Sequence, residues 1–497
     1  MYQRAMEDWL NAVPLRRQVV AYVRAQGLRA YLVGGTVRDI LLGRQSCDLD
    51  IAIEGEALAL ARQVADSLHA AYVPLDAERG VARVVVGARG GAQHLDFAKL
   101  RASDIEADLW ARDFTVNAMA MSLQDPLGQL LDPTGGRGDL AAGVLRIARE
   151  DAFKEDPLRI LRGVRLRGSL SFSLTPETEA LARSWLPALT QASPERIRDE
   201  LVQILTLQDS ASSLAYAGSL GVLLVLFPEL GGPDDGLGER AVRAVASLED
   251  LFGSWTSGDK AIPKDRRMSW PAALETYRPA LARHWAEELS SERKRWIVLK
   301  LAAFLSVIAQ AAVIGAEVSR RLCWSLREIR FVGMAIAASA QVRAWEGQSR
   351  LSPVTIYRYY RHMGDAGVDG ALLSLAMCHA ELGRVKASQS EATFMSHVEQ
   401  LLDAWFEQRS TLVNPTQLLS GHDLQRLLKV PPGRRMGQLL QALREAQVLD
   451  LIHTPEEALE YLHGWAASKA NDKGCPLLPD TGPQGQYEHR GQEDQDK

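Results

Sequence analysis

The spacing of hydrophobic positions changes about one third of the way along the chain. Up to residue 149, apolar residues at helical spacing alternate with short apolar runs typical of strands. The predicted helices and strands are, in chain order, 14–26 (helix), 30–35 (strand), 36–43 (helix), 48–53 (strand), 56–70 (helix), 82–88 (strand) and 93–100 (strand). A turn rich in Gly and Asp at 130–140 ends this part. The pattern predicts a small mixed sheet with helices.

Strand patterns nearly vanish after residue 150, where Leu, Ala and Arg recur at helical spacing up to about residue 470. The predicted fold class is therefore α+β, a small head followed by a long all-α neck, body and tail. Segments rich in Pro and Gly interrupt the helical pattern and mark the predicted boundaries between the parts. The predicted parts are a catalytic head (1–149), a neck (150–225), a body (226–400), a helical tail (401–474) and a disordered polar end (475–497).

Composition limits the classes of function. The chain has 497 residues, too many for one core, and no apolar run long enough to cross a bilayer. Its four cysteines (Cys47, Cys323, Cys378 and Cys475) lack CxxC spacing, which argues against a zinc ribbon or a disulfide framework and suits a reducing cytoplasm. A net charge of −5 means that a nucleic-acid site must be a local basic surface.

Two aspartates stand out in the strand pattern. Asp48 and Asp50 lie two apart, so both side chains face the same side of a strand, where two negative charges are unfavourable unless a cation lies between them. Carboxylate oxygens are the ligands that Mg²⁺ prefers. Asp96, on a later predicted strand, is either a third acidic partner or a plain exposed acid.

A glycine turn precedes this pair in "YLVGGTVRD". Gly34 and Gly35 let a backbone approach a ligand closely, and Arg38 adds a fork of donors suited to phosphate. The segment indicates a phosphate site, although such a turn also serves simply to pack a helix on a sheet.

The segment "ARDFTVNAMAM" places Arg112, Asp113 and Asn117 on one face of a predicted helix. Arg suits a phosphate, and Asp and Asn suit ribose hydroxyls. The plain alternative is an amphipathic helix with a surface ion pair.

The segment "EDPLRILRGVRLRG" places Asp156 and Arg159 three apart, and Arg162 and Arg165 continue the same stripe. An Arg stripe is usually a solvated face. Here an acceptor beside a donor also matches the Watson–Crick edges of cytosine and adenine, whereas guanine and uracil present the reverse order. The pair is therefore predicted to select C and A without a nucleic-acid template.

These segments together resemble one family. The motifs "YLVGGTVRDILLGR", "CDLDIAI", "ARDFTVNAMAM", "LLDPTGGRGDL" and "EDPLRILRGVRL" occur in the order and spacing of class II tRNA nucleotidyltransferases, the bacterial CCA-adding enzymes grouped with bacterial poly(A) polymerases in the polymerase-β-like nucleotidyltransferase superfamily. "SPERIRDEL" and the region 418–447 extend the resemblance into the neck and tail.

The resemblance implies roles for these residues. Asp48 and Asp50 would be metal ligands for Mg²⁺, with a two-metal site expected and Mn²⁺ as the alternative; Gly35 and Arg38 would hold the triphosphate. The remaining residues of the expected nucleotide pocket are Arg112, Asp156, Arg159, Arg162 and Arg165. The expected reaction is attack of a tRNA 3′-hydroxyl on the α-phosphate of CTP or ATP, with release of pyrophosphate.

The sequence departs from the family in three places. Ala111 stands where members commonly have a first arginine. The segment 100–110 is short, as in members that add only CC, so CC addition and full CCA addition both remain open. Ser306 and Val307 occupy the His-Asp place of a phosphohydrolase domain, so any such domain within 226–400 is expected to be degenerate. The isolated His422–Asp423 pair is expected to begin a helix instead.

The expected partners are tRNA, bound at its acceptor stem and elbow, and CTP and ATP, with neither DNA nor a membrane. Candidate tRNA contacts are the basic and aromatic segments 291–296, 319–330, 357–362 and 433–435. Two alternatives stay open: a poly(A) polymerase acting on RNA 3′ ends, and an RNA-binding relative with an inactive head.

Overall fold

The computed structural model describes residues 2–44, 49–87, 93–256, 272–290, 293–382 and 389–471. The chain divides into two compact units, described separately below. One comprises Met1–Ser349 with Asp365–Glu399, and the other comprises Arg350–Gly364 with Gln400–Lys497.

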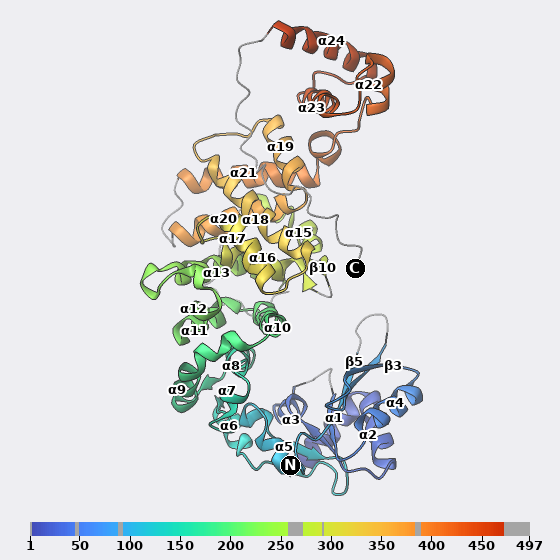
Figure 1. Cartoon of the computed structure of the whole chain (residues 1–497), viewed down its shortest axis with the longest axis vertical. Coiled ribbons are helices and arrows are strands. Elements are labelled where there is room, and N and C mark those ends of the chain that lie inside the picture. The colour runs from blue at the N-terminus through green and yellow to red at the C-terminus, as the bar shows by residue number, and fades with distance from the viewer. Residues whose placement is uncertain are drawn as a thin grey trace, which may run out of the picture. The chain divides into compact units, whose positions relative to one another are not determined.

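The first unit begins with a seven-stranded mixed sheet whose strand order is β3-β4-β5-β2-β1-β6-β7 (Figure 1). Strands β2 and β5 run parallel, and the other neighbouring pairs are antiparallel. The strands are β1 (Ala30–Val33), β2 (Leu49–Ile53), β3 (Ala71–Asp76), β4 (Val81–Val86), β5 (Gln93–Lys99), β6 (Ala120–Ser122) and β7 (Leu130–Leu131).

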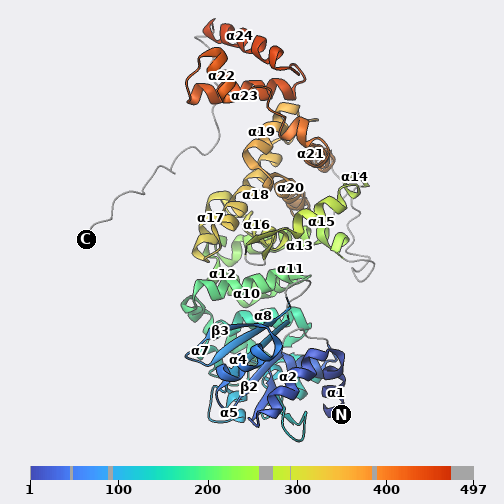
Figure 2. The same cartoon turned by 90° about the vertical axis from the view of Figure 1, so that its right-hand side faces the viewer.

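One face of this sheet is covered by α4 (Ala57–Leu68), which lies against the strands in Figure 2. Tyr72 of β3 faces α4, since the guanidinium carbon of Arg62 lies 4.7 Å from the centre of its ring. The partner of Tyr72 on β4 is Val84, which is fully buried. Alternation along the strands therefore places Val84 and its paired neighbours on the α4 face.

The opposite face carries the acidic positions. Ala52, Val33 and Ala120 pack there against Leu109 of α5 (Ile105–Trp110). Asp50 lies two residues from Ala52, so it belongs to this face. The remaining helices of the head are α1 (Tyr2–Ala12), α2 (Pro14–Ala25), α3 (Gly35–Leu41) and the 3₁₀ turn η1 (Thr115–Asn117).

The neck follows as short helices in which α8 packs against both α10 and α11. A parallel pair, β8 (Val144–Leu145) with β9 (Ser173–Leu174), ties the neck to the end of the head. Its helices are α6 (Gly136–Ala142), α7 (Ala152–Glu155), α8 (Arg159–Leu170), α9 (Pro176–Trp185), η2 (Leu186–Gln191), α10 (Pro194–Thr206), α11 (Ser210–Leu220), α12 (Val222–Leu226), η3 (Pro228–Leu230) and η4 (Pro233–Asp235).

The body packs α18 between α17 and α20, and α13 contacts α16 and α20. Its helices are α13 (Leu237–Thr256), α14 (Ala272–Glu275), α15 (Arg278–Ala286), α16 (Arg295–Leu305), α17 (Ala311–Arg321), α18 (Leu326–Ala344), α20 (Ala366–Leu382) and α21 (Gln389–Phe406); a short hairpin joins β10 (Glu288–Ser290) to β11 (Arg293–Lys294). Ser306 ends α16, where its hydroxyl donates to the carbonyl of Ala303.

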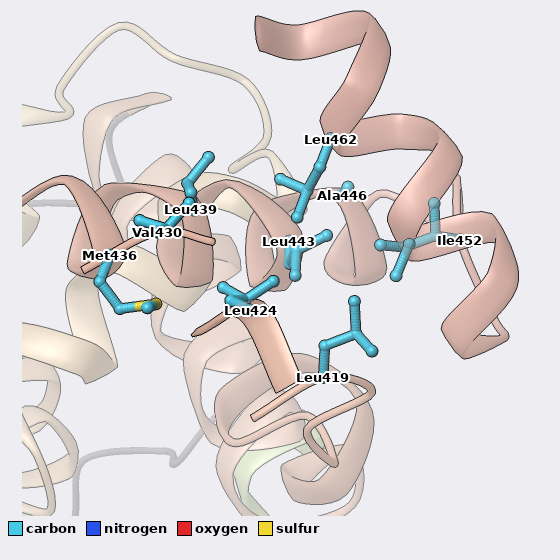
Figure 3. Packing of buried hydrophobic residues seen from close by; sticks show 10 residues of the cluster. Leu419, Leu424, Val430, Met436, Leu439, Leu443, Ala446, Ile452 and Leu462 are labelled. Carbon is cyan, nitrogen blue, oxygen red and sulfur yellow. The ribbon is translucent and has the colours of Figure 1, made fainter. Parts of the chain in front are cut away.

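The second unit contains α19 (Pro353–Met363), the π-helical turn η5 (Arg409–Val413), α22 (Gly421–Leu428), α23 (Arg434–Val448) and α24 (Pro455–Asn471). Leu424, Leu443 and Leu462 come from three helices and gather in one apolar cluster (Figure 3). The prediction that His422–Asp423 begins a helix is confirmed, because Asp423 and Ser420 form a capping box at the start of α22.

The predicted α+β class, with a small mixed sheet followed by helices, is confirmed. Three local predictions were wrong. Strand β3 was missed. Residues 112–117 do not share a helix, since the chain leaves α5 after Trp110 and η1 begins only at Thr115. Asp156 lies outside α8, as the residue that follows α7. The predicted disordered end, 475–497, lies outside the described residues. In the described part of the chain, no helix is long and apolar enough to cross a membrane.

Candidate active site

The glycine turn predicted as a phosphate site connects β1 to α3. Gly34 has φ of 65°, a conformation that a residue with a side chain rarely adopts. A Cβ atom at Gly34 would lie 3.2 Å from Nη1 of Arg112 and 3.7 Å from Oδ2 of Asp50. The glycine turn, the guanidinium of Arg112 and the carboxylate of Asp50 therefore meet from three separate segments. A side chain at Gly34 would crowd both groups.

Asp50 is oriented by the first turn of α3. The buried hydroxyl of Thr36 accepts from the Asp50 amide at 3.0 Å and donates to Oδ2 of Asp50 at 3.4 Å. A single threonine therefore fixes both the backbone and the carboxylate of Asp50. Asp48, the other predicted metal ligand, lies outside the described residues.

Asp96 is the direct neighbour of Asp50 on the parallel strand β5. Its carboxylate accepts two hydrogen bonds from Arg83 of β4, at 2.7 and 2.8 Å. The sheet thus places Asp96 beside Asp50, as a third acidic partner requires, and pairs it with an arginine. The role of Asp96 remains a prediction.

Arg38 lies over the glycine turn. Its Nη1 donates to Oδ1 of Asn117 at 2.8 Å and its Nε to Asp39 at 2.9 Å, and a Cβ at Gly35 would lie 3.4 Å from its Nη2. Asn117 thus contributes through Arg38, which it holds, and not through the predicted helical face shared with Arg112 and Asp113.

Asp113 connects the head to the neck. It is 6% exposed, and its Oδ2 accepts from Nη1 of Arg162 at 3.0 Å. Arg162 and Arg165 both donate to Glu200 of α10. Burial alone would raise the pKa of Asp113, but the charge of Arg162 and the hydrogen bond from the Phe114 amide outweigh it and hold that pKa below its ordinary value.

The predicted base-recognising pair lies at the start of α8, where the Arg159 amide donates to the Asp156 carbonyl and the two side chains bond to other residues. Asp156 accepts from the Leu158 amide at 3.2 Å and from Nη2 of Arg196 at 2.6 Å. Arg159 donates to the carbonyls of Ala111 and Ala152. Each member of the pair is therefore oriented by its own neighbours.

Asp108, which the sequence reasoning missed, is 1% exposed. One of its oxygens accepts from the amide of Arg101 at 2.8 Å, and the other accepts from Nε and Nη2 of Arg112 at 3.0 and 2.9 Å. The spacing of four residues between Asp108 and Arg112 could have predicted this ion pair, since residues at that spacing share a helical face. Thr36, Glu200 and Arg196 were also missed, and only the pairing of acids with arginines in "SPERIRDEL" hinted at the last two.

The donor chemistry of this face fits a hard divalent cation. Asp50 and Asp96 supply carboxylate oxygens from paired positions on two parallel strands. Among the described residues, which exclude Asp48, no group of three or more His, Cys, Asp or Glu side chains is arranged to hold a metal ion. A metal at this position would therefore depend on Asp50 together with Asp48.

The Asp113–Arg162 pair yields a prediction for pH dependence. We expect Asp113→Asn to reduce the free energy of unfolding by about 1–2 kcal/mol at pH 7, a modest cost because the side chain of Arg162 is 43% exposed. Folding lowers the pKa of Asp113 below its unfolded value of about 3.9. The stabilisation by the Asp113 carboxylate is therefore complete above the unfolded pKa and is lost as the pH falls through the lower, folded pKa. Urea denaturation of both proteins at pH 7 and pH 3.5 checks it.

The exposed Asp199, which is hydrogen-bonded to the adjacent Arg198, offers the control Asp199→Asn, for which we expect no change at either pH. A cost for Asp113→Asn that stays constant or grows toward pH 3.5 would contradict the assigned direction of the pKa shift.

Two family descriptions match the chain. Residues 30–146 match the poly A polymerase head domain, and residues 171–231 match the probable RNA and SrmB-binding site of polymerase A. Among solved structures, a CCA-adding enzyme in complex with CTP has a TM-score of 0.64 at 21% identity, covering 93% of this chain and 98% of that one. The Thermotoga maritima CCA-adding enzyme complexed with tRNA has a TM-score of 0.57 at 23% identity, covering 90% and 94%. These likenesses concern the fold.

Relatives of known sequence agree over nearly the whole length. The CC-adding tRNA nucleotidyltransferase of Geobacter sulfurreducens is 32% identical over 452 residues, covering 91% of this chain and 95% of that relative. The A-adding tRNA nucleotidyltransferase of Deinococcus radiodurans is 33% identical over 462 residues, covering 88% and 95%. The family predicted from the motifs is confirmed, and the chain belongs to the tRNA nucleotidyltransferases.

Proposed function

We propose that the protein adds cytidine residues from CTP to the 3′ end of tRNA, releases pyrophosphate, and stops before the terminal adenosine. Membership of the tRNA nucleotidyltransferase family supports the reaction and the tRNA substrate. Relatives named as CC-adding and as A-adding are about equally similar to this chain, so similarity alone does not decide between the nucleotides.

The observation that carries the choice of CTP is the connection between β5 and α5. It spans only residues 100–104 and is fastened at both ends. The amide of Arg101 donates to the buried Asp108, and Asp104 caps α5 by accepting from the Ala107 amide at 2.9 Å. Asp108 also holds Arg112 beside the glycine turn. A pocket that must accept both cytosine and the larger adenine has to rearrange, and a connection tied in this way opposes that rearrangement.

The other residues fit the chemistry of nucleotide addition. Arg38 and Arg112 flank the glycine turn, where they can pair with the triphosphate. Asp156 can accept from the N4 amino group of cytosine, and Arg159 can donate to N3 by exchanging one of its carbonyl partners. Uracil would place its carbonyl oxygen against the carboxylate of Asp156. That repulsion costs on the order of several kcal/mol in a site without water.

We further propose Mg²⁺ as the cofactor, with Mn²⁺ as a substitute, held by Asp50 together with Asp48. Such ions, when bound, activate the attacking 3′-hydroxyl and neutralise the charge of the leaving pyrophosphate. We place the reaction in the cytoplasm, where tRNA and nucleoside triphosphates are available.

The test uses tRNA transcripts that lack three, two or one of their 3′-terminal nucleotides, each incubated with CTP alone, ATP alone or both. We expect CTP alone to extend the two shorter transcripts to the CC end, and ATP to extend none of them. A generic RNA of similar length is the control and should not be extended.

Other products would contradict the proposal in recognisable ways. Completion of the shorter transcripts to CCA with both nucleotides would identify a CCA-adding enzyme. Extension of the CC-ended transcript by ATP, without extension of the shorter transcripts by CTP, would identify an A-adding enzyme. A long adenosine tract on the generic RNA would identify a poly(A) polymerase. No incorporation with any substrate would indicate an inactive head.

A further inference from the structure

Arg196 of α10 forms an ion pair with the base-recognising carboxylate. Its Nη2 lies 2.6 Å from Oδ2 of Asp156, although 40 residues separate the two in sequence. The side chain of Arg196 is 53% exposed, whereas that of Asp156 is 28% exposed. The arginine therefore approaches from the solvent side and holds a carboxylate that is otherwise largely enclosed.

The backbone of Asp156 is held by its neighbours, since its amide donates to the Ala152 carbonyl and its carbonyl accepts from the Arg159 amide, but its carboxylate needs anchors of its own. Asp156 directly follows the four-residue helix α7 as its C-cap, with extended φ and ψ of −146° and 95°. Its Oδ1 accepts from the Leu158 amide, and its Oδ2 accepts from Arg196. One anchor on each oxygen defines the plane of the carboxylate, and each oxygen keeps a lone pair for a further donor.

Arg159 does not supply this anchor. Its guanidinium donates to the carbonyls of Ala111 and Ala152, and its remaining acidic contact is Glu155 at 3.6 Å. Among the residues that the structure describes, the side-chain donor to the Asp156 carboxylate is thus Arg196. Base discrimination by an acceptor depends on where its lone pair points, so a residue that sets the carboxylate plane affects which base is accepted.

We propose that Arg196 is a positioning residue for base selection, holding Asp156 so that its free lone pair meets the amino group of cytosine and repels the carbonyl of uracil. This inference rests on the proposed function and deepens it by assigning part of the C-over-U choice to helix α10. Without Arg196, the carboxylate can rotate away and lose its discrimination while the triphosphate site stays intact.

The test compares Arg196→Ala and Arg196→Lys with the unaltered protein. Binding of CTP and of UTP is measured at equilibrium, and kcat and KM are measured for each nucleotide on tRNA. We expect Arg196→Ala to lower the CTP-to-UTP preference about tenfold or more, mainly through a higher KM for CTP, and Arg196→Lys to retain most of the preference because it keeps the cation. Arg183→Ala is the matched control, since the exposed Arg183 donates to the Ser219 carbonyl, and it should change neither value.

Two results would overturn the proposal. Equal losses for CTP and UTP, with an unchanged ratio, would assign Arg196 to general folding of the neck. A lower KM for CTP in Arg196→Ala would mean that Arg196 obstructs the base. Absence of tRNA extension by the unaltered protein would defeat the proposed function instead, and the binding ratio of CTP to UTP would still decide the role of Arg196.

Discussion

Asp50→Asn is expected to lower kcat for cytidine addition roughly a thousandfold or more, because loss of a metal-binding charge removes several kcal/mol of transition-state stabilisation. Asparagine has nearly the same shape and can still occupy the place that Thr36 defines, so the head should remain folded. The measurement is single-turnover extension of a tRNA lacking its 3′ end, at saturating CTP and Mg²⁺.

The control for this experiment is Asp76→Asn, a partly exposed aspartate on β3 of the same sheet whose carboxylate pairs with Arg79. It should extend tRNA at the unaltered rate. Asp96→Asn is the informative companion. A loss as large as that of Asp50→Asn would make Asp96 a third catalytic carboxylate, and a small loss would make it the partner of Arg83. If Asp50→Asn stayed within tenfold of the unaltered protein, the assignment of Asp50 to the reacting centre would be wrong.

The sequence predicted what depends on spacing within one element. The period of two placed Asp50 on the face opposite the apolar residues of β2, and the glycine pair marked the turn after β1. The same reasoning was wrong for "ARDFTVNAM", where a helix fits the spacing. Phe114 is instead fully buried and forms an isolated antiparallel bridge with Ile147, and this pairing with a residue more than thirty positions away outweighs the local preference.

The contacts that position the site residues could not be predicted from local sequence patterns, because they join segments that are distant in the sequence. Arg38 meets Asn117, Arg162 meets Asp113, and Asp156 meets Arg196 only through the packing of separate helices. Each acid and arginine was visible in the sequence, and an arginine stripe is usually a solvated face. These side chains are assigned to the site by the residues that they contact. The spacing of residues along the sequence does not reveal those contacts.

The largest effect on stability is expected in the body, from Asp369→Ala. Asp369 is fully buried at the start of α20, where its Oδ2 accepts from Nη1 of Arg295 at 2.7 Å and lies 3.0 Å from Nε2 of His284. Arg295 is itself 1% exposed, and its other carboxylate contacts, Glu287 and Asp365, are more than half exposed. Removing Asp369 leaves a buried cation with only these outer partners, which costs about 3–5 kcal/mol.

Native-state hydrogen exchange of the α16 and α20 amides measures this cost directly, since a domain of this size need not unfold in one step. We expect their protection to fall by roughly two to three orders of magnitude in Asp369→Ala. Glu287→Ala removes a 54% exposed partner and should cost under about 1 kcal/mol. The double variant Arg295→Met with Asp369→Leu removes both charges and should recover most of the loss, because burying matched apolar groups avoids the desolvation of an unpaired ion. If the double variant were as unstable as Asp369→Ala, the loss would come from altered packing and not from the stranded charge of Arg295.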